Sequence, residues 1–144
     1  MEISVRWDNS KHSIIRVTFD GYWPFANQRI GLNKLDRMLD EVEHRVDLLI
    51  EFLHDANSNV PFSLFNRDDI TDLSYMAHPN SGVVVMVNAP RYMCCATTVF
   101  GRMYPDIGER IMHVDNLDDA YAVLGFFQLG YVPFANLTRD CSCN

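Results

Sequence analysis

Apolar residues follow two different periods in the first third of the chain. They alternate with polar residues over 3–7 and again over 15–19, and the turn-rich residues between these runs predict a hairpin of two half-buried strands. Pro24 then opens a stretch in which apolar residues recur at steps of three or four, ending with Val46. This spacing predicts a long amphipathic helix from about Pro24 to Arg45.

The rest of the chain alternates short apolar runs with helical patterns. Residues 48–53 and 83–87 are almost entirely apolar, which predicts two strands buried on both faces of a sheet. A short last strand is predicted over 110–114. Each segment between and after these strands has a residue that can begin a helix, and the predicted helices span 66–77, 90–101 and 117–126.

This order of elements predicts an α/β fold. Because strands that alternate with helices pair in parallel through right-handed crossovers, we expect a mixed, largely parallel sheet of about five strands with four helices. One domain is predicted over 1–126, since 144 residues suffice for one core. Residues 127–144 are too apolar for a solvated tail and are predicted to dock on this domain or on a second copy, with a homodimer slightly favoured.

Three segments bear on the family of the chain. They are Phe-Asp-Gly-Tyr-Trp at 19–23 after the hairpin, 46–51 in the central strand, and 115–124 at the last helix. In these segments and in the order of its elements, the chain resembles the STAS fold and, within it, the SpoIIAA-like family of sporulation anti-sigma-factor antagonists. The resemblance covers about residues 3–126. It implies a non-catalytic module that docks proteins or apolar ligands and requires no cofactor.

The same resemblance implies a serine switch just after the central strand. In the best-known members of the family, this serine lies in an Asp-Ser-x-Gly turn and is phosphorylated. Here Ser58 follows Asp55 by three residues, and the loop has no glycine that would let another backbone approach closely. We therefore interpret this loop as a polar surface loop and expect no kinase-operated switch at Ser58.

Net charge and the distribution of apolar residues limit the partners and the location that we expect for this protein. Nineteen acidic residues against twelve basic ones give a net charge of −7, which disfavours nucleic acids and anionic membrane surfaces. No apolar run is as long as a membrane span, and the first residues lack the apolar centre of a signal peptide, so a cytoplasmic location is expected.

Four cysteines are too few for a disulfide scaffold, and in the cytoplasm they are expected to be reduced. Cys94 and Cys95 would point about 100° apart on a helix, which suits neither a shared metal nor an unstrained bridge. Cys141 and Cys143 are expected to lie in a frayed, reduced tail, with a metal or redox role as the alternative.

Polar residues follow the predicted parallel strands at their carboxyl ends, where open parallel sheets bind ligands. This predicts an interaction or ligand crevice formed by three loops and the start of one helix, with the residues His54, Asp55, Ser58, Asp68, Asp69, Asn88, Arg91 and Asp115. An acid/base pair of His54 and Asp55 is the strongest catalytic alternative, but no serine or cysteine has the context of an activated nucleophile. Histidine, cysteine and glycine spacings match no metal or nucleotide motif, so no catalytic residue, metal or cofactor is predicted.

These observations predict a regulatory module that works by binding a protein partner. Aromatic residues and methionines are frequent in the second half of the chain, and they suit an adaptable apolar groove. A carrier of a small apolar, lipid-like ligand is therefore the alternative function, and an unrecognised hydrolase is the third.

Overall fold

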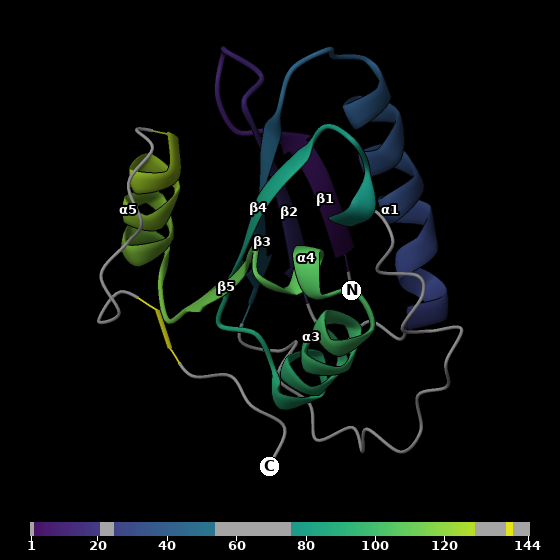
Figure 1. Cartoon of the computed structure of the whole chain (residues 1–144). Helices are drawn as coiled ribbons and strands as arrows, with labels where there is room; N and C mark the ends of the chain where they lie inside the picture. Colours follow the sequence, from purple (N-terminus) through teal and green to yellow (C-terminus); the bar gives the residue numbers. More distant parts are fainter. Residues whose placement is uncertain (1, 21–24, 54–75, 129–137, 140–144) are drawn as a thin grey trace.

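The computed structural model describes residues 2–20, 25–53, 76–128 and 138–139 of the chain. In these residues, five strands form one sheet with helices on both of its faces (Figure 1). The strands are β1 (Glu2–Trp7), β2 (Ile14–Asp20), β3 (Val46–Phe52), β4 (Ser81–Val87) and β5 (Ile111–Val114). The helices are α1 (Phe25–Asp40), α3 (Arg91–Met103), the short α4 (Pro105–Gly108) and α5 (Leu117–Gln128).

The described residues confirm the expected α/β class, with a mixed sheet of five strands and four helices. The set of helices differs from the predicted one, because α4 was not predicted. The helix predicted over 66–77 lies almost entirely outside the described residues.

The strands lie side by side in the order in which they occur in the sequence, from β1 to β5. β1 pairs antiparallel with β2, and each of the later strands is parallel to the one before it. Right-handed crossovers between strands in sequential order place the connecting helices on one face of the sheet. Accordingly, α1 and α3 lie on one face and α5 lies on the other (Figure 1).

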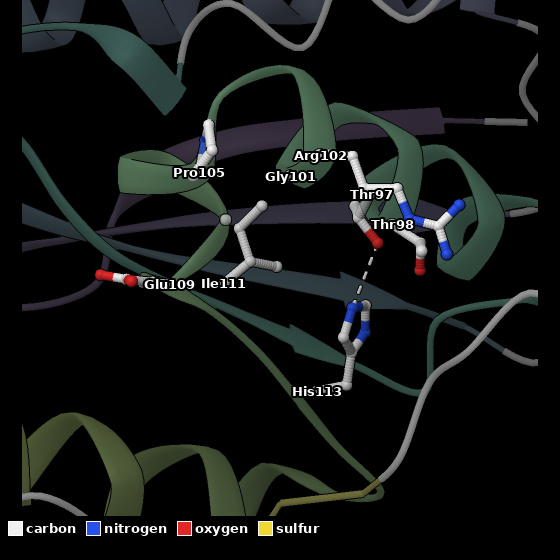
Figure 2. A pocket seen from close by; sticks show the side chains of 9 residues that line it. Thr97, Thr98, Gly101, Arg102, Pro105, Glu109, Ile111 and His113 are labelled. Atoms are coloured by element: carbon white, nitrogen blue, oxygen red, sulfur yellow. Dashed lines mark hydrogen bonds between the residues drawn. The ribbon is translucent and has the colours of Figure 1, made fainter.

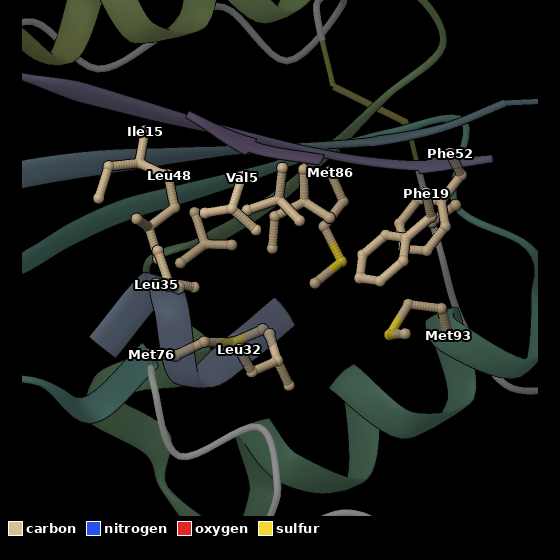
Figure 3. Packing of buried hydrophobic residues seen from close by; sticks show 14 of the residues in the cluster. Val5, Ile15, Phe19, Leu32, Leu35, Leu48, Phe52, Met76, Met86 and Met93 are labelled. Carbon is tan, nitrogen blue, oxygen red and sulfur yellow. The ribbon is translucent and has the colours of Figure 1, made fainter. Parts of the chain in front are cut away.

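Each face of the sheet has its own apolar core. In the first core, Leu35 of α1 and Met93 of α3 pack with strand residues such as Phe19, whose ring stacks on that of Phe52 at 5.2 Å between centroids (Figure 3). In the second core, α5 covers β4 and β5. All seven residues of β3 and all seven of β4 are buried, which confirms that these strands are covered on both faces.

The predicted end of the first long helix is wrong, because α1 ends at Asp40 rather than near Arg45. The side chain of Asn80, just before β4, donates hydrogen bonds to the carbonyl oxygens of Leu39 (2.9 Å) and Val42 (2.8 Å). The first bond satisfies a carbonyl group that the helix leaves unpaired at its end, and the second holds the chain just after the helix. Val46 continues the apolar spacing of the helix but is the first residue of β3, where its N–H donates to the Asn80 carbonyl at 2.7 Å.

The last helix begins at the predicted position and extends further than expected. The Asn116 side chain caps it by accepting a hydrogen bond from the N–H of Asp119 at 2.8 Å. The helix continues to Gln128, so Phe127 belongs to α5 and packs against the second core. Among the described residues, none of the helices combines the length and the apolar character needed to cross a bilayer.

Candidate ligand site at the edge of the sheet

A pocket of about 440 Å³ lies beside β5, the edge strand of the sheet, on the face covered by α3 (Figure 2). Its volume is within the range of small-molecule and peptide side-chain sites. We call it the β5 pocket, and it is lined by Thr97, Thr98, Gly101, Arg102, Pro105, Gly108, Glu109, Ile111 and His113.

The sequence forms this pocket through helical spacing on α3 and alternation on β5. Thr97 and Gly101 are four residues apart and therefore lie on one side of α3, while Ile111 and His113 alternate to the same face of β5. Gly101 also lets α4 approach closely, since a Cβ atom on Gly108 would lie 2.7 Å from the Gly101 Cα atom. The close contact between α3 and α4, which forms one side of the pocket, thus depends on two glycines.

His113 is the only buried histidine among the described residues, and it is 8% exposed. Its Nε2 atom lies 3.2 Å from the hydroxyl oxygen of Thr97, which in turn donates to the carbonyl oxygens of Met93 (3.0 Å) and Cys94 (3.1 Å). Because the hydroxyl proton is directed at these carbonyl groups, we assign the imidazole proton to Nε2, which donates to Thr97. Nδ1 is buried and has no hydrogen-bond partner in the described residues.

Burial and the positive charge of Arg139 lower the pKa of His113 to about 4. The imidazole is therefore neutral at neutral pH. Thr97 is 4% exposed and its hydroxyl directs its proton to the helix, so this pair does not present an accessible nucleophile with a free base.

Exposed charged side chains line the two ends of the pocket, and two exposed apolar residues lie close to them in the sequence. In the view of Figure 2, Arg102 lies toward one end and Glu109 toward the other. Met103 and Tyr104, which follow Arg102 at the corner between α3 and α4, are 36% and 43% exposed. Two opposite charges therefore line the pocket, and two exposed apolar side chains directly follow Arg102 in the sequence.

The outer edge of β5 presents backbone groups beside the pocket. The Arg110 carbonyl accepts a hydrogen bond from a β4 N–H, and the Val114 carbonyl accepts one from the residue just after β4, both at 2.9 Å. Because backbone groups alternate in direction along a strand, the N–H and C=O groups of Ile111 and His113 point away from β4. The His113 carbonyl accepts the N–H of Arg139 at 2.7 Å. Within the described residues, no backbone group pairs with the outward N–H and C=O of Ile111.

Five of the eight predicted crevice residues lie outside the described residues: His54, Asp55, Ser58, Asp68 and Asp69. The other three, Asn88, Arg91 and Asp115, are exposed residues at or just after the carboxyl ends of β4 and β5. The Asn88 N–H donates to the Val114 carbonyl at 2.9 Å, which joins the ends of these two strands. Because the strand order never reverses among the parallel strands, that edge lacks the switch point at which α/β sheets open a crevice.

Arg139 links two of the predicted loops and was not among the predicted site residues. Its guanidinium lies 3.5 Å from the Asp115 carboxylate and donates to the carbonyl oxygen of Ala89. The tail was predicted to dock through apolar residues, and a single arginine in it gave no signal. Residues 129–137 and 140–144, where most of those apolar residues lie, are outside the described residues.

The expectation that the cysteines are reduced is wrong for Cys94 and Cys95, which are both disulfide-bonded. Cysteine spacing alone does not reveal which sulfur atoms a fold brings together, and both residues lie on the buried side of α3. The two tail cysteines, Cys141 and Cys143, lie outside the described residues. In the described part of the chain, no three histidine, cysteine or acidic side chains are grouped as metal ligands would be.

A second, smaller cavity of about 210 Å³ lies where Asp47, Arg45 and Phe127 meet. The Asp47 carboxylate is 2% exposed and accepts hydrogen bonds from the Arg45 guanidinium at 3.0 Å and the Val83 N–H at 2.9 Å. These bonds join the starts of β3 and β4, so we assign Asp47 a structural role.

Comparisons with protein-family models, curated proteins and solved structures found no match to this chain. The STAS-like assignment therefore stays a prediction, and the candidate site is supported only by the distances, burial and contacts described above.

Proposed function

We propose that the protein is a STAS-like, SpoIIAA-like regulatory module that binds an extended segment of a protein partner along the outer edge of β5. The observation that carries this proposal is the pairing of an outward-facing backbone at Ile111 with an adjacent pocket of about 440 Å³. A peptide that adds to a sheet edge gains affinity from main-chain hydrogen bonds and specificity from pockets for alternate side chains. The β5 edge supplies both elements.

The residues in and next to the pocket support a protein ligand more than a small apolar one. Exposed Met103 and Tyr104 are the kinds of side chain that anchor protein interfaces, and Arg102 and Glu109 can select the charge of the incoming segment. A carrier of a small apolar ligand would instead enclose most of the ligand surface, whereas this pocket is open to solvent and has the charged residues Arg102 and Glu109 in its lining.

No catalytic role, metal or cofactor is part of this proposal. A hydrolase would need an accessible hydroxyl beside a base, and Thr97 is buried with its proton directed to the helix. A cytoplasmic location and a homodimer stay predictions.

The proposal is tested by selecting binders from a random peptide library against the full chain. Affinities are then measured for two matched variants, Tyr104→Ser beside the pocket and Tyr121→Ser on α5, whose tyrosines are 43% and 39% exposed. We expect Tyr104→Ser to weaken binding by about tenfold, the effect of losing about 1.4 kcal/mol of contact energy, and Tyr121→Ser to leave it unchanged.

A scan of the selected peptide by N-methylation tests the mode of binding. Along an added strand, only every second N–H faces the sheet, so methylation should weaken binding at alternate positions. A library that yields no binder, equal binding by both tyrosine variants, or a scan without alternation would show that the proposed function is wrong.

A further inference from the structure

The smaller cavity, of about 210 Å³, lies at the amino ends of the parallel strands, on the face of the sheet that α5 covers. We call it the β3 cavity. It lies between the turn before β2, the start of β3 and the end of α5, and among the described residues it is lined by Ser13, Arg45, Asp47, Phe127 and Gln128. The β5 pocket is on the other face and shares none of these residues, so a ligand of the β3 cavity does not depend on the proposed function.

The Asp47 carboxylate uses only one of its two oxygens in its structural role. Oδ1 accepts the Arg45 Nε–H at 3.0 Å and the Val83 N–H at 2.9 Å, and Arg45 Nη2 lies 3.0 Å from the same atom. No group in the described part of the chain donates to Oδ2, although the Asp47 side chain is only 3% exposed. Unlike the unpaired Nδ1 of His113, this oxygen is not fully enclosed by the protein, so it is reached from the cavity. A carboxylate oxygen has two lone pairs, and burying it without a donor is unfavourable, so Oδ2 is suited to a ligand that donates hydrogen bonds.

The fold holds the Asp47 carboxylate and the Arg45 guanidinium together at the cavity. The register of β3 on β4 shifts around Asp47, whose side chain takes part in the ladder by accepting the Val83 N–H. Gly82 leaves room for the pair, because a Cβ atom there would overlap both the Asp47 carboxylate and the Arg45 side chain. The Nε and Nη2 atoms of Arg45 face Oδ1, whereas Nη1 has no acceptor within the described residues. The cavity therefore has an unused acceptor on an anion beside an unused donor on a cation.

We propose that the β3 cavity binds a small apolar α-amino acid in its zwitterionic form. The ligand ammonium group donates to Asp47 Oδ2, the ligand carboxylate accepts from Arg45 Nη1, and the ligand side chain packs against the Phe127 ring. In an α-amino acid, both charged groups are attached to one carbon atom, so they are close together, as the two charges of the cavity are. A simple amine would be repelled by Arg45 and a simple carboxylate by Asp47, whereas a zwitterion complements both charges.

The size and the apolar wall of the cavity limit the ligand further. At about 30 Å³ for each molecule of liquid water, the cavity holds about seven waters. This room suits an amino acid of about the size of valine. Phe127 is partly buried against the second core, which fixes its ring as one wall. Contact with this ring favours an apolar side chain on the ligand over a polar one.

Calorimetric titration of the full chain with three matched compounds tests the recognition of both charges. The compounds are L-valine, isobutylamine, which lacks the carboxylate, and isovalerate, which lacks the amino group. We expect saturable binding of L-valine and at least tenfold weaker binding of each of the other two. If L-valine does not bind, or if either analogue binds as tightly as L-valine, the proposal is wrong.

Two variants then test whether L-valine binds at this cavity. Asp47→Asn keeps an oxygen for the Val83 N–H and replaces Oδ2 by an NH₂ group, so it should weaken binding at least tenfold. Arg45→Gln, at a side chain that is 52% exposed, should weaken binding to a similar extent and provides a second test that does not alter a buried residue. The matched control is Arg37→Gln, at an exposed arginine of α1, which should bind L-valine as the wild-type protein does. Wild-type affinity in Arg45→Gln, or in folded Asp47→Asn, would overturn the proposed site.

Discussion

Replacing Gly108 with alanine should separate α3 from α4 and destabilise the protein by about 2 kcal/mol. The new Cβ atom would lie 2.7 Å from the Gly101 Cα atom and 3.0 Å from its carbonyl oxygen. Carbon atoms pack at about 3.5–4.0 Å, so the two backbones would have to move apart by about 1 Å. Forcing an additional methyl group into a packed contact costs about 1–3 kcal/mol. Backbone atoms cannot move aside as a flexible side chain can.

Thermal and urea denaturation, followed by circular dichroism, measure this effect. An unfolding entropy of about 2.1 cal/mol/K per residue gives roughly 0.3 kcal/mol/K for a chain of this length, so Gly108→Ala should lower Tm by about 7 °C. Gly125→Ala is the matched control, because a Cβ atom there meets nothing within 4 Å and the residue lies inside α5. Alanine is the better helix former by about 1 kcal/mol, so this control should raise Tm by about 3 °C. If Gly108→Ala melts at the wild-type temperature, the close contact of α3 with α4 is not as described.

Three further predictions concern stability. The pKa of His113 is lowered to about 4 in the folded state, so the unfolded chain takes up the proton first as pH falls below 6.5. Urea titrations should therefore show that the free energy of unfolding decreases by about 2 kcal/mol between pH 7 and pH 5. The variant His113→Gln should lose this pH dependence, and the control variant His44→Gln, at an exposed histidine, should keep it. Asn116→Ala removes the cap of α5 and should cost about 1 kcal/mol in the same assay; an unchanged urea midpoint would mean that the cap contributes nothing. Asp47→Ala leaves the buried Val83 N–H without its acceptor and should cost about 2–3 kcal/mol, whereas Asp47→Asn, which keeps an oxygen there, should cost less.

The strands could be predicted from the sequence because their signals are local. Seven consecutive buried residues in β3 and in β4 correspond to apolar runs that a chain can place only between two covered faces. The end of α1 could not be predicted, because the side chain that caps it belongs to Asn80, about 40 residues later. Val46 fits the apolar spacing of the helix, and only pairing with β4 assigns it to a strand.

The candidate site depends on contacts between residues far apart in the sequence. Thr97 and His113 were not among the predicted site residues, and their hydrogen bond joins α3 to β5 across the short helix α4, which the sequence pattern did not predict. Arg139 meets Ala89 across 50 positions, and no local spacing in the tail indicates that contact. Asn88 and Asp115 could be placed at strand ends from the sequence, since the carboxyl ends of parallel strands share one edge.

The sequential strand order has a consequence for how the protein is made. A ribosome releases each strand of this sheet when its neighbour has already emerged, so the sheet can grow outward from the β1–β2 hairpin one strand at a time. On the unfinished chain, the edge of β4 stands open until β5 arrives, and the second face of β4 is uncovered until α5 follows. The hydrogen bond from Tyr121 to Asp8, which spans 113 positions, forms only after that step. The edge that we assign to partner binding is therefore also the last part of the sheet to be synthesised.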